Sequence, residues 1–252
     1  MSTSNLIYNT IAETYGYNIA SSTTEHLKFK LLLEHCNSNH SVLDIGCANG
    51  IYSIPLAKHC KQIIGIDINQ KMIEQFNQKS TSNSITNVTC ELKDASELHT
   101  LNKGPFDIIF SYSTLLLVPK IEHVLSTIPK IMSPNGVGLL DLTGKYNLSQ
   151  RFWKKWYSDR GHHTFNAFSY RQIEKLLRDS GLSIIKSYGL GFCDQWKYLP
   201  FINKVASKFS IIDKFFHIPI GNDIDYFISN LPIIKHFANR WLIVVRKSDE
   251  QT

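Results

Sequence analysis

An α/β fold with one doubly wound sheet is predicted by the alternation of short apolar runs and longer amphipathic stretches along the chain. Short apolar runs, such as IIGI at residues 63–66 and IIF at residues 108–110, are typical of parallel strands that helices cover on both sides. The chain has 252 residues and 43% hydrophobic content, which is sufficient for one large core. We therefore expect a single domain over residues 1–252. The expected strands lie at residues 41–45, 62–66, 88–92, 106–110, 137–142, 182–188 and 241–246.

The first expected strand and the turn after it, SVLDIGCANG at residues 41–50, are the most informative stretch. Gly46 and Gly50 follow a buried strand, and glycine allows the backbone to turn tightly and to approach a ligand. The spacing differs from the dinucleotide-binding fingerprint, which needs glycine where this chain has Ala48 and Ile51. It also differs from a phosphate-binding P-loop, because no lysine and hydroxyl residue follow the last glycine. The pattern Asp-x-Gly-x-x-x-Gly therefore indicates a different nucleotide-type site.

Acidic residues follow the next two expected strands. Asp67 comes directly after residues 62–66, about 20 residues past the glycine turn. A carboxylate at this place can accept hydrogen bonds from both ribose hydroxyls of an adenosine. Asp94 and Ala95 follow residues 88–92 in the same way. Because the carboxyl ends of parallel strands meet at one edge of a sheet, we expect these residues to lie near the glycine turn.

The sequence VLDIGCANG resembles motif I of the class I S-adenosylmethionine (SAM)-dependent methyltransferases. The resemblance implies SAM as the cofactor and S-adenosylhomocysteine (SAH) as its product. It also implies a Rossmann-like, seven-stranded doubly wound sheet with a reversed last strand and helical insertions after strands five and six. The family usually has glycine at the position of Ala48, where we expect alanine to give tighter rather than lost contact.

The resemblance further implies a set of cofactor-binding residues. Asp44 is expected near the positively charged methionine end of SAM, and Asp67 at the ribose. Asp94 and Ala95 are expected at the adenine. Ser111 ends the fourth strand, which in this family lies beside the methyl group that is transferred. The complete set of expected cofactor contacts is Tyr15, Asp44, Gly46, Ala48, Gly50, Asp67, Ile68, Asp94, Ala95 and Ser111.

Residues 1–40 are expected to form lid helices ahead of a cofactor-binding core at residues 41–143. The spacing of Tyr8, Ala12 and Tyr15 resembles a segment that folds over the cofactor in many small-molecule methyltransferases. Tyr15 is the predicted lid contact. An amphipathic helix whose tyrosines only pack on the domain would have the same pattern, and the sequence leaves both interpretations open.

Two insertions, at residues 144–168 and 189–240, leave the carboxyl ends of the fifth and sixth strands and are expected to face the substrate. The first contains His162 and His163, which are candidate catalytic bases for a hydroxyl acceptor. Structural loop histidines bonded to the backbone are the alternative. The second contains a basic amphipathic stretch at residues 201–216, which either lies at a membrane surface or packs on its own domain.

Other function classes are disfavoured by what the sequence lacks. Its five cysteines have no Cys/His ligand spacing, so we predict neither a metal site nor a disulfide framework. Residues 111–114 lack the pattern by which family members hold the amine of a nucleic-acid base, which is an acidic or amide residue followed by Pro-Pro and an aromatic residue. No apolar run reaches the ~18 residues needed to span a bilayer, and the start has no leader pattern. We therefore expect a cytoplasmic protein, with membrane contact limited to its periphery.

The charge is unevenly distributed along the chain. Residues 1–143 carry 10 basic and 12 acidic side chains, whereas residues 144–252 carry 17 and 9. We predict a SAM-dependent methyltransferase that methylates an oxygen of a small or lipid-linked, sugar-like acceptor. The basic C-terminal half keeps RNA as the main alternative acceptor, since Lys and Arg neutralise phosphates. A fold that binds SAM without catalysis is a second alternative.

Overall fold

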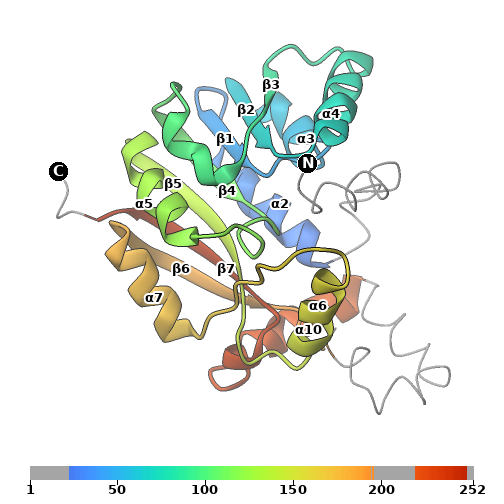
Figure 1. Cartoon of the computed structure of the whole chain (residues 1–252), viewed down its shortest axis with the longest axis vertical. Coiled ribbons are helices and arrows are strands. Elements are labelled where there is room, and N and C mark those ends of the chain that lie inside the picture. Colours follow the sequence, from blue (N-terminus) through green and yellow to red (C-terminus); the bar gives the residue numbers. More distant parts are fainter. Residues whose placement is uncertain (1–22, 194, 196–218, 249–252) are drawn as a thin grey trace.

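The computed structural model describes residues 23–193, 195 and 219–248. Its strands are β1 (Ser41–Ile45), β2 (Gln62–Asp67), β3 (Val88–Leu92), β4 (Phe106–Ser111), β5 (Met132–Thr143), β6 (Leu182–Leu190) and β7 (Arg240–Lys247). They form one seven-stranded sheet in the order β3-β2-β1-β4-β5-β7-β6, with helices on both faces (Figure 1). Strands β1 to β5 are parallel, and β7 is antiparallel to both of its neighbours. The predicted sheet with a reversed last strand is confirmed.

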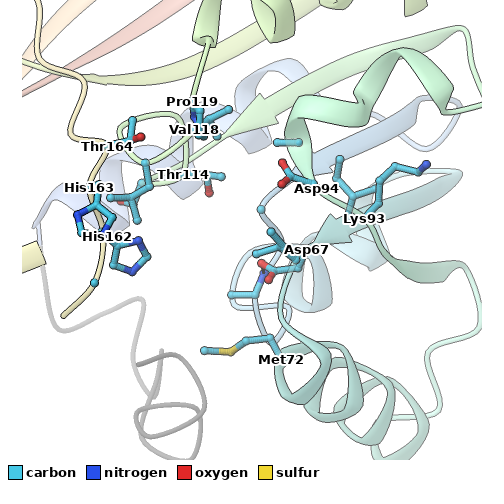
Figure 2. A pocket seen from close by; sticks show the side chains of 18 residues that line it. Asp67, Met72, Lys93, Asp94, Thr114, Val118, Pro119, His162, His163 and Thr164 are labelled. Carbon is cyan, nitrogen blue, oxygen red and sulfur yellow. Dashed lines mark hydrogen bonds between the residues drawn. The ribbon is translucent and has the colours of Figure 1, made fainter. Parts of the chain in front are cut away.

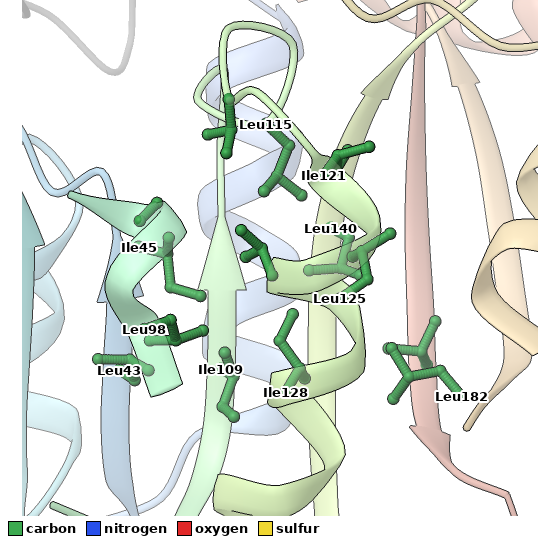
Figure 3. Packing of buried hydrophobic residues seen from close by; sticks show 14 of the residues in the cluster. Leu43, Ile45, Leu98, Ile109, Leu115, Ile121, Leu125, Ile128, Leu140 and Leu182 are labelled. Atoms are coloured by element: carbon green, nitrogen blue, oxygen red, sulfur yellow. The ribbon is translucent and has the colours of Figure 1, made fainter. Parts of the chain in front are cut away.

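Two apolar clusters lie between the sheet and its helices. On one face, Leu98, Leu125 and Ile128 pack against the sheet (Figure 3). On the other face, Leu32 and Phe76 belong to a second cluster. Both clusters are almost wholly buried, and this burial of apolar surface is the main contribution to the stability of the layers. The helices are α2 (Thr23–His35), α3 (Ser53–Leu56), α4 (Gln70–Ser82), α5 (Ile121–Ile131), α6 (Gln150–Ser158), α7 (Tyr170–Asp179) and α10 (Pro219–Ser229), with 3₁₀ turns η2 (Ala57–His59), η3 (Ala95–Thr100) and η5 (Ile234–Phe237).

The start of β5 differs from the prediction. The residues Ser133-Pro134-Asn135-Gly136 form a turn signal, from which the strand was expected to begin at Val137. In the structure Met132 already pairs with Phe106, and Val137 pairs with Ile108. The intervening residues therefore form an irregularity inside a longer strand. The pairing across the sheet therefore begins the strand before the turn signal rather than after it.

Two of the predicted features lie outside the described residues. They are the segment from Tyr8 to Tyr15, with its predicted lid contact, and the amphipathic stretch at residues 201–216. The first insertion is described throughout and contains α6, whereas the second is described in part through α10 and η5. Within the described part of the chain, no helix combines the length and the hydropathy that are needed to cross a membrane.

Candidate active site

A cavity of about 530 Å³ lies at the carboxyl ends of β1 to β4 (Figure 2). Its wall is formed by the glycine turn after β1, the ends of β2 and β3, the loop after β4 and residues 161–164 of the first insertion. In open α/β sheets ligands bind at this edge. The predicted site residues that line the cavity are Gly46, Ala48, Asp67, Ile68, Asp94, Ala95, His162 and His163.

The carboxylate of Asp67 is held by two backbone groups. Its Oδ2 accepts a hydrogen bond from the N–H of Ala48 at 2.9 Å, and its Oδ1 accepts one from the N–H of Asn69 at 2.9 Å. Burial raises the pKa of Asp67, and these backbone hydrogen bonds oppose that rise. A carboxylate has about four acceptor sites, so Asp67 retains acceptor capacity for the hydroxyls of a ligand.

The glycine turn leaves no room for a side chain at Gly46. The φ angle of Gly46 is +82°, and a Cβ atom there would lie 2.0 Å from Oγ1 of Thr114. Ala48 also has a positive φ, of 46°, in the left-handed region that favours glycine. The alanine at this position therefore carries backbone strain, in addition to the tighter contact that the sequence predicts.

Asp94 lies on the same side of the cavity as Asp67, whereas His162 and His163 lie on the opposite side (Figure 2). Oδ1 of Asp94 accepts a hydrogen bond from the N–H of Ser96 at 2.8 Å and so caps η3. This bond uses one acceptor site of the carboxylate and leaves others for a ligand. The side chain of Ala95 is buried next to it.

The ring of His162 has an aromatic neighbour and a shifted pKa. His162 is buried, and its ring packs edge-on against Tyr157 with the ring centroids 5.7 Å apart. Burial lowers the pKa of His162, and the neighbouring His163 lowers it further. The His162 imidazole is therefore neutral at pH 7, which is the protonation state that a general base requires.

Three predicted cofactor contacts lie outside the lining of the cavity. Asp44 is buried below the turn, and Oγ of Ser53 donates a hydrogen bond to it at 2.6 Å. Burial raises the pKa of Asp44 to about 8. Gly50 packs against α3, where a Cβ atom would lie 2.6 Å from Ile54. Ser111 donates a hydrogen bond to the carbonyl of Ile45 at 3.0 Å and so ties β4 to β1.

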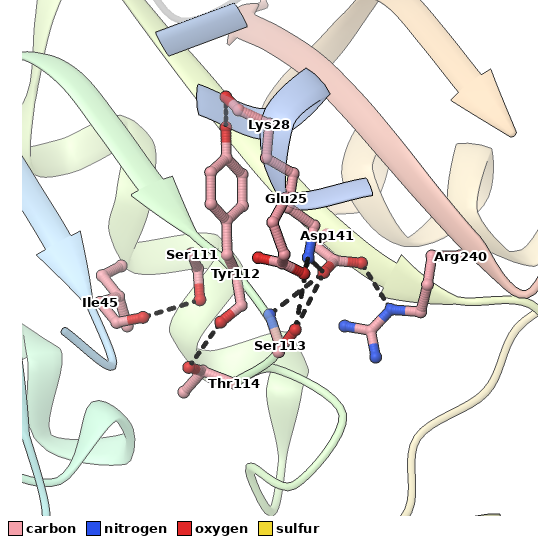
Figure 4. A network of polar contacts seen from close by, with 9 residues as sticks. All are labelled: Glu25, Lys28, Ile45, Ser111, Tyr112, Ser113, Thr114, Asp141 and Arg240. Atoms are coloured by element: carbon pink, nitrogen blue, oxygen red, sulfur yellow. Dashed lines mark hydrogen bonds and ion pairs between the residues drawn. The ribbon is translucent and has the colours of Figure 1, made fainter. Parts of the chain in front are cut away.

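Sequence reasoning missed a buried ionic network beside the cavity (Figure 4). Asp141 of β5 is wholly buried, with Nζ of Lys28 2.8 Å from its Oδ2 and Nε of Arg240 2.7 Å from its Oδ1. Burial alone would raise the pKa of Asp141, but the two cations hold it well below its ordinary value. One signal was available, because Lys28 lies one helical turn before the buried Leu31 and Leu32 and therefore shares their face.

Comparison with known proteins identifies the family. Residues 36–214 match the family described as "Methyltransferase domain". The chain belongs to this family. The order of the sheet, its reversed last strand and the glycine turn are those of the class I SAM-dependent methyltransferases, and SAM is the cofactor. The prediction drawn from VLDIGCANG is thereby confirmed at the level of the family.

Individual methyltransferases match parts of this chain. The 23S rRNA (uracil(1939)-C(5))-methyltransferase RlmD of Legionella pneumophila is 35% identical over 105 residues, which cover 40% of this chain and 22% of RlmD. The ubiquinone biosynthesis O-methyltransferase of Bartonella tribocorum is 22% identical over 168 residues, which cover 61% of this chain and 64% of that enzyme. Both matches thus span less than two thirds of the relative.

A solved methyltransferase structure has the same fold over nearly the whole chain. The SAM-dependent methyltransferase of Clostridium acetobutylicum superimposes with a TM-score of 0.61. The superposition covers 96% of this chain and 97% of that chain, at 14% sequence identity. At this identity the likeness establishes the shared fold. It does not identify the acceptor, which depends on the residues around the cavity of the present chain.

Proposed function

We propose that this methyltransferase binds SAM in the 530 Å³ cavity and methylates an oxygen of a small or lipid-linked acceptor. One observation carries the proposal. Asp67 and Asp94, at the ends of neighbouring strands, line one side of a cavity whose opposite side contains His162 and His163. The first pair suits a nucleoside, and the second pair suits proton transfer from a hydroxyl.

The lining of the cavity supports the cofactor contacts that we propose. Asp67 accepts from the ribose hydroxyls with the lone pairs that Ala48 and Asn69 leave unused. Asp94 and the backbone of Ala95 face the adenine. The backbone of the turn at Gly46 lies along the methionine portion, where the absence of a side chain permits close approach.

In this proposal, a structural role without direct contact to SAM belongs to Asp44, Gly50 and Ser111. Each of them holds a neighbouring element in place. Asp44 accepts a hydrogen bond from Ser53, Gly50 packs against α3, and Ser111 ties β4 to β1. Their substitution should therefore act on the shape of the turn and on stability more than on direct contact with SAM.

When bound, SAM supplies a methyl group on a sulfonium, which is a good leaving group for in-line displacement by the acceptor oxygen. Residues around the cavity then have to align the acceptor oxygen at about 3 Å and remove its proton. The imidazole of His162 or His163 accepts this proton in our proposal. The lowered pKa of His162 favours this residue, since its neutral ring can take a proton at pH 7.

The acceptor class is supported by two features. The match to the ubiquinone biosynthesis O-methyltransferase extends over 61% of this chain and therefore beyond a single motif. Residues 111–114, which follow the end of β4, are Ser-Tyr-Ser-Thr and lack the Pro-Pro-aromatic pattern of base N-methyltransferases.

RNA is the second candidate acceptor. RlmD is named as an rRNA methyltransferase. Its sequence identity to this chain, 35%, is the higher of the two relatives. The basic excess in residues 144–252 would also favour a polyanion. Against RNA, the RlmD match covers only 40% of this chain, which is too little to include both the cofactor core and the insertions.

The test is transfer of labelled methyl from SAM into an extract of the host cell that is then separated into lipid, RNA, protein and small-molecule fractions. Label in the lipid or small-molecule fraction that is lost with Asp67→Ala would support the proposed acceptor. Label in RNA would replace it with the second candidate. No label in any fraction, together with SAM binding by calorimetry, would favour a protein that binds SAM without catalysis.

A further inference from the structure

A second cavity, of about 280 Å³, lies beside the first. The two cavities share Ser113, which follows the end of β4 and has a φ angle of 58°. The N–H and the hydroxyl of Ser113 both approach Oδ2 of Asp141, at 3.2 Å and 3.4 Å. Asp141 therefore holds the residue at which the two cavities meet (Figure 4). A molecule in the second cavity would lie next to one in the first.

Two polar side chains in the wall of this second cavity have unused hydrogen-bonding groups. Thr143 and Arg240 are cross-strand partners in β5 and β7, so their side chains share one face of the sheet. Oγ1 of Thr143 and Nη2 of Arg240 are both buried and have no hydrogen-bond partner among the described residues. Since Nε of Arg240 donates to Asp141 at 2.7 Å, the guanidinium is oriented while its Nη2 stays available. Buried donors of this kind favour a ligand oxygen.

Two cations and two carboxylates lie around the second cavity. Lys28 and Arg240 both face Asp141, so two cations share one carboxylate in the buried part of the wall. Glu25 also lines this cavity and lies 3.2 Å from Lys28, but its side chain is 30% exposed and its charge is better screened by water. A ligand carboxylate or phosphate can instead accept a charge-assisted hydrogen bond from the unused Nη2 of Arg240.

Three aromatic rings form another part of the wall. Trp153 and Tyr157 of α6 and Phe165 of the same insertion line the cavity, and the rings of Trp153 and Tyr157 lie 6.3 Å apart between centroids. Tyr157 and Phe165 are 5.7 Å apart. Aromatic walls of this kind bind flat apolar groups through offset and edge contacts. At about 280 Å³, the cavity has room for a small molecule rather than a polymer.

We infer that this second cavity is the acceptor pocket, and that it takes a small molecule with a planar apolar body and an anionic oxygen bound by Arg240 and Thr143. The inference rests on the proposed function, because it takes the first cavity to be the SAM site. The atom to be methylated points toward Ser113, where the two cavities meet. The anionic oxygen lies at the opposite end of the molecule and orients it.

The test is titration calorimetry on the full chain saturated with SAH, with 4-hydroxybenzoate and phenyl phosphate as anionic probes and 4-hydroxybenzamide as the uncharged control. We expect at least one anionic probe to bind at least tenfold more tightly than the amide, and the two probes distinguish carboxylate from phosphate. Arg240→Lys keeps a cation for Asp141 but removes Nη2, so the anionic probe should bind about tenfold more weakly to this variant. Arg171→Lys on the exposed side of α7 is the matched control and should change nothing.

The other outcomes distinguish a failure of the acceptor pocket from a failure of the proposed function. Equal binding of the amide and both anions, or no probe binding by a chain that binds SAH, would overturn the acceptor pocket and leave the SAM site intact. Failure to bind SAH would instead overturn the proposed function. If thermal unfolding shows that Arg240→Lys is not folded, Thr143→Val gives the decisive result. It removes Oγ1 with little change in shape, and unchanged affinity for the anionic probes in this variant would also overturn the inference.

Discussion

Nζ of Lys28 lies 2.8 Å from Oδ2 of Asp141, and both side chains are almost completely buried. This ion pair joins α2, which precedes the first strand, to β5 near the middle of the sheet. Lys28 also donates to Oγ of Ser113 at 3.4 Å. Because Ser113 lines both cavities, the ion pair fixes the wall between the cavities that we assign to SAM and to the acceptor.

The first prediction concerns Asp141→Asn. This change removes the buried countercharge that Lys28 and Arg240 share, while Lys28 keeps its contact with the partly exposed Glu25. The free energy of unfolding should therefore fall by about 3–5 kcal/mol at pH 7. Urea unfolding measures the loss. The exposed Asp179→Asn at the end of α7 is the control and should change stability by less than about 0.5 kcal/mol. A loss below about 1 kcal/mol for Asp141→Asn would contradict the importance of the network.

The pH dependence of the same variant follows from the lowered pKa of Asp141. The unfolded carboxyl titrates near pH 3.9, and the folded one at lower pH. The advantage of the wild type over Asp141→Asn is therefore fully present above about pH 4. It should decrease as the pH falls below that value, because protonation removes the charge that pairs with Lys28 and Arg240.

The second prediction concerns Asp67→Ala. The variant loses the acceptor for the ribose hydroxyls, and a hydrogen bond to a charged group contributes about 1.5–3 kcal/mol. We expect SAM affinity, measured by titration calorimetry, to fall by at least tenfold. Glu174→Ala on the exposed face of α7 serves as the control. Unchanged SAM affinity in Asp67→Ala would rule out the assignment of this carboxylate to the cofactor.

The third prediction concerns Gly46→Ala. The new Cβ would meet the side chain of Thr114 at 2.0 Å, and the positive φ adds strain of about 1–3 kcal/mol. Both the melting temperature and SAM affinity should fall. Adding Thr114→Gly removes the steric part and should recover part of the melting temperature, but not all of it, because the backbone strain remains. Full recovery in the double variant would show that backbone conformation is unimportant at this turn.

The fourth prediction concerns Asp44→Asn. The unfolded carboxyl titrates near 3.9, whereas the pKa of Asp44 in the folded chain is about 8. Between about pH 4 and pH 8 the folded chain holds a proton that the unfolded chain has released. The wild type therefore loses up to about 1.4 kcal/mol per pH unit in that range, and Asp44→Asn does not.

The measurement for Asp44→Asn is urea unfolding of both proteins from pH 5 to pH 9. The stability of Asp44→Asn relative to the wild type should rise up to about pH 8 and then become constant. A difference that does not change with pH would mean that Asp44 is ionised in the folded protein across the whole range. Its carboxylate would then be available to the cationic end of SAM, as the sequence first suggested.

The fifth prediction concerns His162→Asn combined with His163→Asn. If one ring is the general base, turnover should fall by roughly 10²–10⁴-fold while SAM affinity stays the same. The activity of the wild type should also fall on the acid side with a midpoint below 6.5, because the base must be neutral and the pKa of His162 is lowered. Undiminished turnover in the double variant would leave both histidines with a structural role.

Much of the cofactor half could be predicted because its signals are local in the chain. The apolar run before Gly46, the left-handed turn and the acidic residue after β2 depend on neighbouring residues and on the known geometry of parallel strands. Asp67 and Asp94 could be placed at one edge of the sheet for this reason. The structure adds the close approach of Thr114 to Gly46, which joins two separate strand ends.

Local patterns in the sequence predict the order of strands and helices, the glycine turn and the family. Tertiary structure decided which side chains share a cavity. Thr143 and Arg240 become neighbours only through the antiparallel pairing of β5 with β7, and Lys28 reaches Asp141 only because α2 packs on the sheet. The physical reason is that strand and turn signals act over a few residues, whereas a buried charge is stabilised by partners that only the packing of the whole chain can bring near.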